Sequence, residues 1–308
     1  MSESVNIPIV KLKGKNASES DVNQAWEQDN QAWWDWYVTL AHNNINEKNN
    51  GQVHHESLSG KLLSLDELKD ELNTTYPISK VQKDFFWKNG FLKVKNMFSE
   101  NAIFTLNSEL TRIISKNFTP SRIEKSNFLS MDLIWLQNKL IKEFVFAKRI
   151  SKTATELLNV SSIRLYHDNI LVKLPACGRT PWHYDTHHFP LDTNEVITAW
   201  IPSQPIPENM GPLSFATPLD AYKLVEKVNF NKFDTSYDRE VSRIFAKNKI
   251  SIESGPFEMG EVSFHHNLCF HSASSNLTST NRMVLANTYF ADGSKVVKNP
   301  TMVSGDWK

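Results

Sequence analysis

Cysteine is scarce in this chain of 308 residues, which contains Cys177 and Cys269 and no others. Neither has a second cysteine close enough in sequence to form a CxxC pair, so the pattern argues against both a disulfide framework and a thiolate zinc site. The simplest inference is a protein of a reducing compartment, and we expect a cytoplasmic location.

The chain also has no net charge, because 34 Lys and Arg residues balance 34 Asp and Glu residues. No basic cluster with interleaved aromatic residues occurs, which argues against nucleic acid as a partner. No apolar window reaches the length of a transmembrane helix, and the stretch MSESVNIPIVKLKGK has no long apolar core, so we expect no membrane partner. The composition, with 40% hydrophobic residues, is that of an ordinary globular protein, and we expect a monomer or homodimer.

Helical patterns come first along the chain, and short β-type runs follow. We expect one helix that ends at Gly90 and others over residues 100–116 and 138–158. After Val160 the runs IRLYHDNILVKL, EVITAWIPS, EVSFHHN and RMVLANTYFA predict short strands. Residues 219–254 interrupt them with helical and irregular sequence. This order predicts an α+β protein built on a barrel or jelly roll with a helical insert.

The chain divides, in this interpretation, into residues 1–75, an arm and helical extension packed on the core, and residues 76–308, the main domain. In the first part, Ser64 and Glu67 form a capping-box pattern at the start of a helix. The tryptophan-rich stretch DVNQAWEQDNQAWWDWYVTLAHNN predicts a helix with an aromatic face. That face either docks on the domain as extra core or serves as a lid or a subunit interface.

The heptapeptide WHYDTHH carries the chemistry that stands out. In a strand, alternate side chains share a face, so His183 and Asp185 would point the same way and could grip one ion. A third ligand must come from elsewhere, and GEVSFHHNLCFHSASSN offers His265, His266 and His271. Two histidines and one carboxylate leave three coordination positions open, the arrangement of non-haem Fe(II) oxygenases.

Three segments together resemble the phytanoyl-CoA dioxygenase family of Fe(II)/2-oxoglutarate oxygenases, whose core is a double-stranded β-helix, a type of jelly roll. They are HDNILVKLPACGRTPWHYDTHHF, GPLSFATP and GPFEMGEVSFHHNLCFHSASSNLTSTNR. The resemblance covers roughly residues 80–295. The interval of eleven residues from His271 to Arg282 is the spacing that this family usually shows.

The resemblance implies that His183, Asp185 and His271 are the iron ligands and catalytic centre. Arg282 would then hold the far carboxylate of 2-oxoglutarate through a bidentate fork that lysine could not match. The implied activity uses Fe(II), 2-oxoglutarate and O2 to oxidise, most simply to hydroxylate, an unactivated C–H bond of a small-molecule substrate. Succinate and CO2 would be released.

Further cosubstrate contacts follow from the resemblance at Asn169 and Trp200, which lie near where the family places them. One position departs from the pattern. Family members often carry a serine two residues after the distal histidine, whereas this chain has Ala273 between Ser272 and Ser274. A second hydroxyl contact to the far carboxylate is therefore in doubt.

The remaining histidines near the motifs have more ordinary interpretations. His187 would share a face with His183 in a continued strand, but about 13 Å of strand would separate them, too far for one small ion. We interpret His187 and His188 as residues of a loop or of the pocket rim. His265 and His266 face opposite sides of one strand, so at most one reaches the pocket, and both are interpreted as structural.

Other functions remain as alternatives. The chain has no GxSxG motif, so a Ser-His-Asp hydrolase is disfavoured. Radical halogenation is disfavoured because Asp185 fills the place that a halide would need. A jelly-roll protein that binds a metal or a small molecule without catalysis stays open. The identity of the substrate does not follow from the residues.

Overall fold

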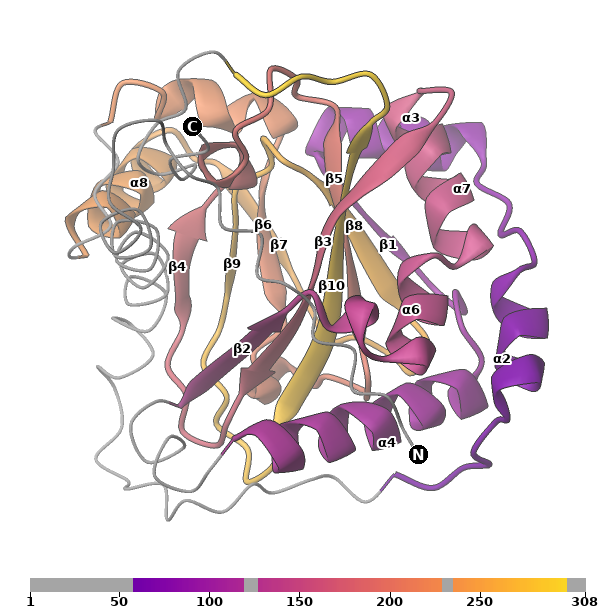
Figure 1. The fold of residues 1–308 in the computed structure, drawn as a ribbon. Helices are drawn as coiled ribbons and strands as arrows, with labels where there is room; N and C mark the ends of the chain where they lie inside the picture. Colours follow the sequence, from indigo (N-terminus) through magenta and orange to yellow (C-terminus); the bar gives the residue numbers. More distant parts are fainter. Residues whose placement is uncertain (1–57, 119–126, 229–234, 298–308) are drawn as a thin grey trace, which may run out of the picture.

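The computed structural model describes residues 58–118, 127–228 and 235–297, and the tryptophan-rich stretch of the predicted N-terminal arm lies outside them. Two antiparallel sheets stand face to face (Figure 1). The larger sheet has the strand order β1-β8-β5-β10-β3-β2, and the smaller has the order β4-β9-β6-β7. This is the predicted double-stranded β-helix with flanking helices, so the fold prediction is confirmed.

The strands of the larger sheet are β1 (Phe91–Val94), β2 (Phe128–Asp132), β3 (Ile163–Lys173), β5 (Val196–Pro202), β8 (Val262–His266) and β10 (Arg282–Ala291). Those of the smaller sheet are β4 (Thr180–His183), β6 (Leu213–Thr217), β7 (Ser251–Ser254) and β9 (His271–Ala273). Every residue of β5 is buried. The larger sheet is covered on both faces, which explains why its central strands are largely apolar in sequence.

Helices cover the outer face of the larger sheet (Figure 1). They are α2 (Leu65–Leu72), α3 (Lys80–Asn89), α4 (Glu100–Asn117), α6 (Lys139–Val145) and α7 (Lys148–Leu158). The capping box of Ser64 and Glu67 is present at the start of α2, and Gly90 ends α3 with a φ of 84°. Leu68 and Leu72 bury the inner face of α2 in the main core, so this part of the predicted extension packs on the sheet domain. The division at residue 75 stays a prediction.

The predicted single helix over residues 138–158 is two helices, which is a correction. The chain breaks between α6 and α7, where Ala147 takes a ψ of 125°. Neither glycine nor proline marks the break in the sequence. A tertiary contact accompanies it, because the hydroxyl of Tyr289 in β10 donates to the carbonyl of Val145 at 2.6 Å and satisfies one of the free carbonyls at the end of α6.

The insert, residues 219–254, is only partly helical. It contains the short 3-10 helix η4 (Leu219–Leu224) and α8 (Ser236–Lys247), which lies outside the smaller sheet (Figure 1). Its last four residues form β7 and pair with β6, which corrects the prediction of a helical and irregular insert. β7 is exposed along its whole length, so its sequence lacks the apolar alternation that would have revealed it.

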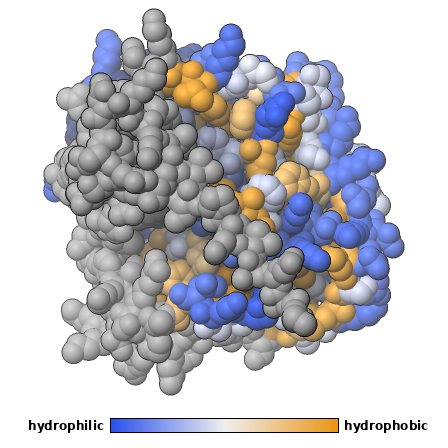
Figure 2. Space-filling model, in the orientation of Figure 1, coloured by the Kyte–Doolittle hydropathy of each residue, from blue (hydrophilic) through white to orange (hydrophobic). Residues whose placement is uncertain are grey.

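Three further 3-10 turns complete the described chain, namely η1 (Ile134–Leu136), η2 (Asp185–His188) and η3 (Glu208–Met210). Many hydrophilic residues lie along the right-hand edge of the face shown in Figure 2, over the helical layer. Within residues 58–118, 127–228 and 235–297, no helix is both long and apolar enough to cross a membrane.

Candidate active site

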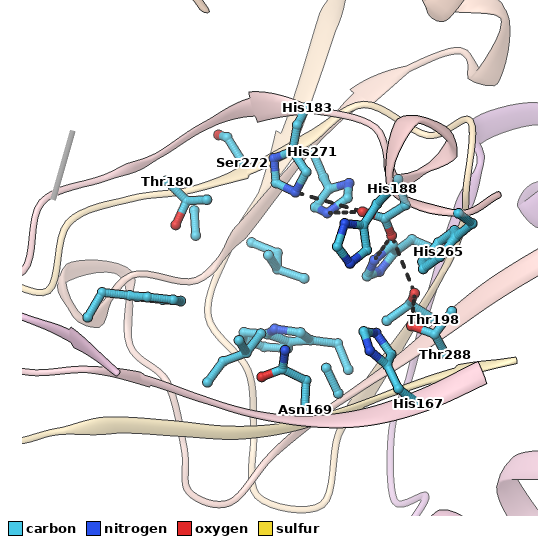
Figure 3. A pocket seen from close by; sticks show the side chains of 18 of the residues that line it. His167, Asn169, Thr180, His183, His188, Thr198, His265, His271, Ser272 and Thr288 are labelled. Atoms are coloured by element: carbon cyan, nitrogen blue, oxygen red, sulfur yellow. Dashed lines mark hydrogen bonds and ion pairs between the residues drawn. The ribbon is translucent and has the colours of Figure 1, made fainter. Parts of the chain in front are cut away.

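Three of the predicted residues come together between the two sheets. His183 ends β4 and lies directly opposite His271, which begins β9. β4 ends at His183 and η2 begins at Asp185, so the two residues do not lie on one strand as the sequence analysis expected. Tyr184 is still extended, however, and Asp185 returns to the side of His183. One ligand atom from each of His183, Asp185 and His271 lies within 4.8 Å of the others. Figure 3 shows the two histidine rings side by side.

Hydrogen bonds fix the tautomers of both histidines. Nδ1 of His183 lies 2.8 Å from the carbonyl of Pro181, and Nδ1 of His271 lies 3.0 Å from the carbonyl of Cys269. Because a carbonyl only accepts, each Nδ1 carries the hydrogen and each Nε2 keeps its lone pair. These Nε2 atoms lie 3.9 and 3.8 Å from Oδ1 of Asp185. Metal-binding histidines are oriented in the same way.

Burial sets the charge of the three groups. It lowers the pKa of His183, and it lowers that of His271 well below the ordinary value. Burial alone raises the pKa of Asp185, but the neighbouring imidazoles, led by His271 and His265, lower that pKa by more, so the carboxyl is ionised. Two neutral imidazoles and one carboxylate suit a divalent transition metal with open positions, and the donor set therefore fits Fe(II).

A pocket surrounds these three side chains and holds a cavity of about 110 Å³. That volume is several times the ~10–15 Å³ that one water needs on the same kind of measure. His167, from the middle of β3, and Arg282, the first residue of β10, both line it. Apolar side chains such as Leu171 and Leu213 fill much of the wall. The space suits a small organic molecule beside the triad.

Arg282 is a buried cation that has no anionic partner among the described residues. Its side chain is 2% exposed, and one terminal nitrogen donates to the carbonyl of Gly211 at 3.2 Å. Its Nε has no hydrogen-bond partner, and no carboxylate of the described residues forms an ion pair with it. Burial lowers its pKa to about 10, so it is still charged at neutral pH. An unpaired buried guanidinium in a pocket is a site for a carboxylate.

Asn169 and Trp200 line the same pocket on either side of Ala286, which pairs with both of them in register. The ring of Trp200 lies 5.3 Å from the guanidinium carbon of Arg282. The side-chain oxygen of Asn169 accepts from the hydroxyl of Ser130 at 3.1 Å. The structure therefore brings all six predicted site residues to one pocket.

A sequence model described as phytanoyl-CoA dioxygenase (PhyH) matches residues 86–284, which is more than half of the chain. The chain belongs to the phytanoyl-CoA dioxygenase family. Peroxisomal phytanoyl-CoA dioxygenase of Bos taurus is 24% identical over 272 residues, covering 78% of this chain and 77% of the relative. The enzyme of the same name from Rattus norvegicus is 24% identical over 250 residues, covering 71% and 70%.

Solved structures show the same fold for this phytanoyl-CoA dioxygenase family member. The α-ketoglutarate-dependent carbocyclase SnoK from nogalamycin biosynthesis superposes with a TM-score of 0.60 at 19% identity, covering 71% of this chain and 87% of that one. EctD from S. alaskensis, solved with 2-oxoglutarate and 5-hydroxyectoine, gives 0.59 at 14% identity, with 75% and 84% covered. Together with the family, these likenesses support a 2-oxoglutarate-dependent oxygenase.

Sequence reasoning did not find Lys173, although this family member uses it to shape the pocket. Its ammonium group is fully buried and donates to the carbonyls of Gly178, Ala273 and Ser274 at 2.9, 3.2 and 2.7 Å. It thus fastens the segment that follows the distal histidine. A lysine inside the apolar run ILVKL was the available signal, since such a residue is rarely buried without partners. Ser272 lines the pocket beside Ala273.

The other histidines separate as alternation predicts. His265 lines the pocket, with Nε2 3.6 Å from Oδ2 of Asp185, whereas His266 contacts the ring of Trp87 on α3. His188 also lines the pocket, while the side chain of His187 lies outside the described part of the structure. The sequence therefore did not reveal that His265, interpreted as structural, lies in the pocket next to Asp185.

Proposed function

We propose that this chain binds Fe(II) through His183, Asp185 and His271 and uses 2-oxoglutarate and O2 to hydroxylate an unactivated C–H bond of a small-molecule metabolite, releasing succinate and CO2. One observation carries the proposal. Two buried histidines, with both Nε2 lone pairs turned toward the partly buried carboxylate of Asp185, share a pocket with Arg282, a buried cation whose Nε has no hydrogen-bond partner among the described residues.

The residues of the chain have separate tasks in this proposal. Arg282 binds the far carboxylate of the cosubstrate, and the adjacent Trp200 ring keeps the guanidinium in place. Leu171 and Leu213 exclude water from the space beside the triad. Bound iron, 2-oxoglutarate and O2 would supply the oxidising chemistry, and the protein supplies position and a dry environment.

Solved neighbours support the choice of cofactors. EctD from S. alaskensis was crystallised with bound Fe and also with 2-oxoglutarate, and the epimerase SnoN was crystallised with Fe3+, α-ketoglutarate and nogalamycin RO. Their named ligands include small organic molecules, which favours a metabolite as substrate here. The curated relatives are named as peroxisomal, whereas the cytoplasm stays our prediction for this chain, as does a monomer or homodimer.

Anaerobic visible absorbance tests the proposal directly. We expect a weak charge-transfer band that requires both Fe(II) and 2-oxoglutarate, because the keto acid would chelate a ferrous ion held by the triad. Asp185→Ala should remove both the band and the turnover while leaving the circular dichroism spectrum unchanged. A folded, metal-loaded wild-type protein without the band would favour the non-catalytic metal binder instead. If the band appears, succinate release with candidate metabolites would identify the substrate.

A further inference from the structure

Four polar side chains form one row across the pocket face of the larger sheet. His265 of β8 is the register partner of Thr198 of β5, Thr198 is the partner of Thr288 of β10, and Thr288 is the partner of His167 of β3. All four line the pocket and lie on one side of it in Figure 3. Valine would suit these four positions of a largely apolar sheet equally well, so the polarity of the row calls for a reason.

Hydrogen bonds connect the middle of this row to the carboxylate. The hydroxyl of Thr198 donates to Oδ2 of Asp185 at 3.3 Å, and the hydroxyl oxygens of Thr198 and Thr288 lie 3.0 Å apart. An ionised carboxylate only accepts, and a threonine hydroxyl has a single hydrogen. Since Thr198 gives its hydrogen to Asp185, Thr288 must donate to Thr198. The direction of both hydrogen bonds is thereby set.

The two carboxylate oxygens of Asp185 consequently have different surroundings. Oδ1 faces Nε2 of His183 at 3.9 Å and Nε2 of His271 at 3.8 Å. Oδ2 faces Thr198 and, on its other flank, Nε2 of His265 at 3.6 Å. One oxygen is thus turned to the other candidate ligands, and the second is turned to the larger sheet.

We propose that Thr288 and Thr198 form a two-hydroxyl brace that holds Oδ2 of Asp185 against the larger sheet, so that the residue offers a metal ion Oδ1 alone. The brace rests on the proposed function, because it assumes that the ion binds at the triad. Thr198 and Thr288 are positioning residues that act through Asp185. Without the brace, the carboxylate could rotate and offer both oxygens or neither, and affinity would fall.

A local irregularity accompanies the brace. The register of β10 against β3 shifts between Thr288 and Tyr289, immediately after the hydroxyl that begins the brace. Such bulges re-aim side chains and occur next to active sites. Here the unpaired residue is Tyr166 of β3, next to His167 at the end of the polar row. Tyr289 of β10 faces the helical layer, where its hydroxyl donates to the carbonyl of Val145.

The test is a titration of the full-length protein with Co(II), without 2-oxoglutarate, followed by visible absorbance. Thr198→Val keeps the shape of the side chain and removes the hydroxyl, and we expect about a tenfold or greater loss of affinity, the range for groups that orient a metal ligand. Thr198→Ser should restore the wild-type affinity and spectrum, because serine keeps the donor. Serine rescue would not be expected if the side chain only filled space.

A double substitution gives a second readout, because Thr288 reaches Asp185 only through Thr198. Thr288→Val should weaken Co(II) binding in the wild-type background and have no further effect in the Thr198→Val background, because it acts only through Thr198. Thr153→Val is the matched control. Thr153 is a buried threonine of α7 whose hydroxyl has no hydrogen-bond partner, and it does not line the pocket, so its loss should leave affinity unchanged.

The outcomes separate the brace from the proposed function. If wild type and Asp185→Ala bind Co(II) equally, the triad is not the metal site and the proposed function fails. If Asp185→Ala loses binding while Thr198→Val keeps wild-type affinity, the brace alone is overturned. Additive effects of the two valine substitutions would also overturn it. Should Thr198→Val fail to fold, Thr288→Val and Thr288→Ser decide the question with the same readout.

Discussion

Burying a guanidinium without an anion costs desolvation free energy. The environment of Arg282 is therefore best explained by a bound anionic ligand. Within the part of the chain that the structure describes, its hydrogen bond to a protein acceptor goes to the carbonyl of Gly211, and the ring of Trp200 lies against it. Neither neighbour carries negative charge, and desolvation of a cation is offset only by pairing. At the scale of single residues, this imbalance is the reason for proposing Arg282 as the residue that binds the far carboxylate of the cosubstrate.

Substitution of Arg282 by lysine tests that interpretation. Arg282→Lys keeps the charge but loses the planar fork, so at least one charge-assisted hydrogen bond of roughly 1.5–3 kcal/mol should be lost. We expect the apparent KM for 2-oxoglutarate to rise about tenfold or more, while Fe(II) affinity measured without 2-oxoglutarate stays the same. Equal KM values for the two proteins would contradict the assignment of Arg282 to the cosubstrate.

At the scale of elements, α8 of the insert holds the strand that carries the first histidine of the triad. Asp238 in the first turn of α8 is 2% exposed and accepts a hydrogen bond from the backbone of Trp182 at 2.7 Å. It also forms an ion pair with Arg179 just before β4. The ring of Trp182 packs edge-on against Phe245 of α8. The insert therefore anchors β4 immediately before His183.

Loss of the charge at Asp238 should loosen this anchor. Asp238→Asn removes the ion pair with Arg179, and we expect the free energy of unfolding to fall by roughly 1–3 kcal/mol. Hydrogen exchange should rise in β4 and α8 more than in β8. Glu240→Gln on the same helix is the control, because Glu240 and Arg243 are exposed and solvent screens their ion pair, so this substitution should change stability far less. Equal effects of the two substitutions would argue against the anchor.

For the whole molecule, two partly buried histidines that line the pocket connect folding to pH. Burial lowers the pKa of His167 to about 3 and that of His188 to about 4. In the unfolded chain both titrate near the ordinary value of about 6.5. Between these values the unfolded state binds more protons than the folded state, so stability is complete above pH ~6.5 and is lost progressively as the pH falls.

Chemical denaturation at two pH values measures this dependence. We expect each of the two histidines to account for a loss on the order of 2 kcal/mol between pH 6.5 and 5. In His167→Gln, which cannot take up a proton in this range, the fall in stability from pH 7 to pH 5 should be smaller by about that amount. The same pH dependence in both proteins would mean that His167 is not kept neutral by the fold.

Local patterns in the sequence determined most of the fold and of the candidate site. The capping box at Ser64, the stop at Gly90 and the strand runs after Val160 depend on residues within a few positions of one another, so they could be predicted. The spacing within each of two pairs, His183 with Asp185 and His271 with Arg282, indicated the family for the same reason, because each pair belongs to one local segment.

Only the tertiary structure decided how distant segments meet. The Thr288–Thr198–Asp185 connection depends on the register between strands that lie about ninety residues apart, which no local period encodes. The break between α6 and α7 and the strand at the end of the insert arise in the same way, from partners supplied by other elements. The candidate site residues could therefore be predicted from the sequence, whereas the contacts that position them depend on packing across the two sheets.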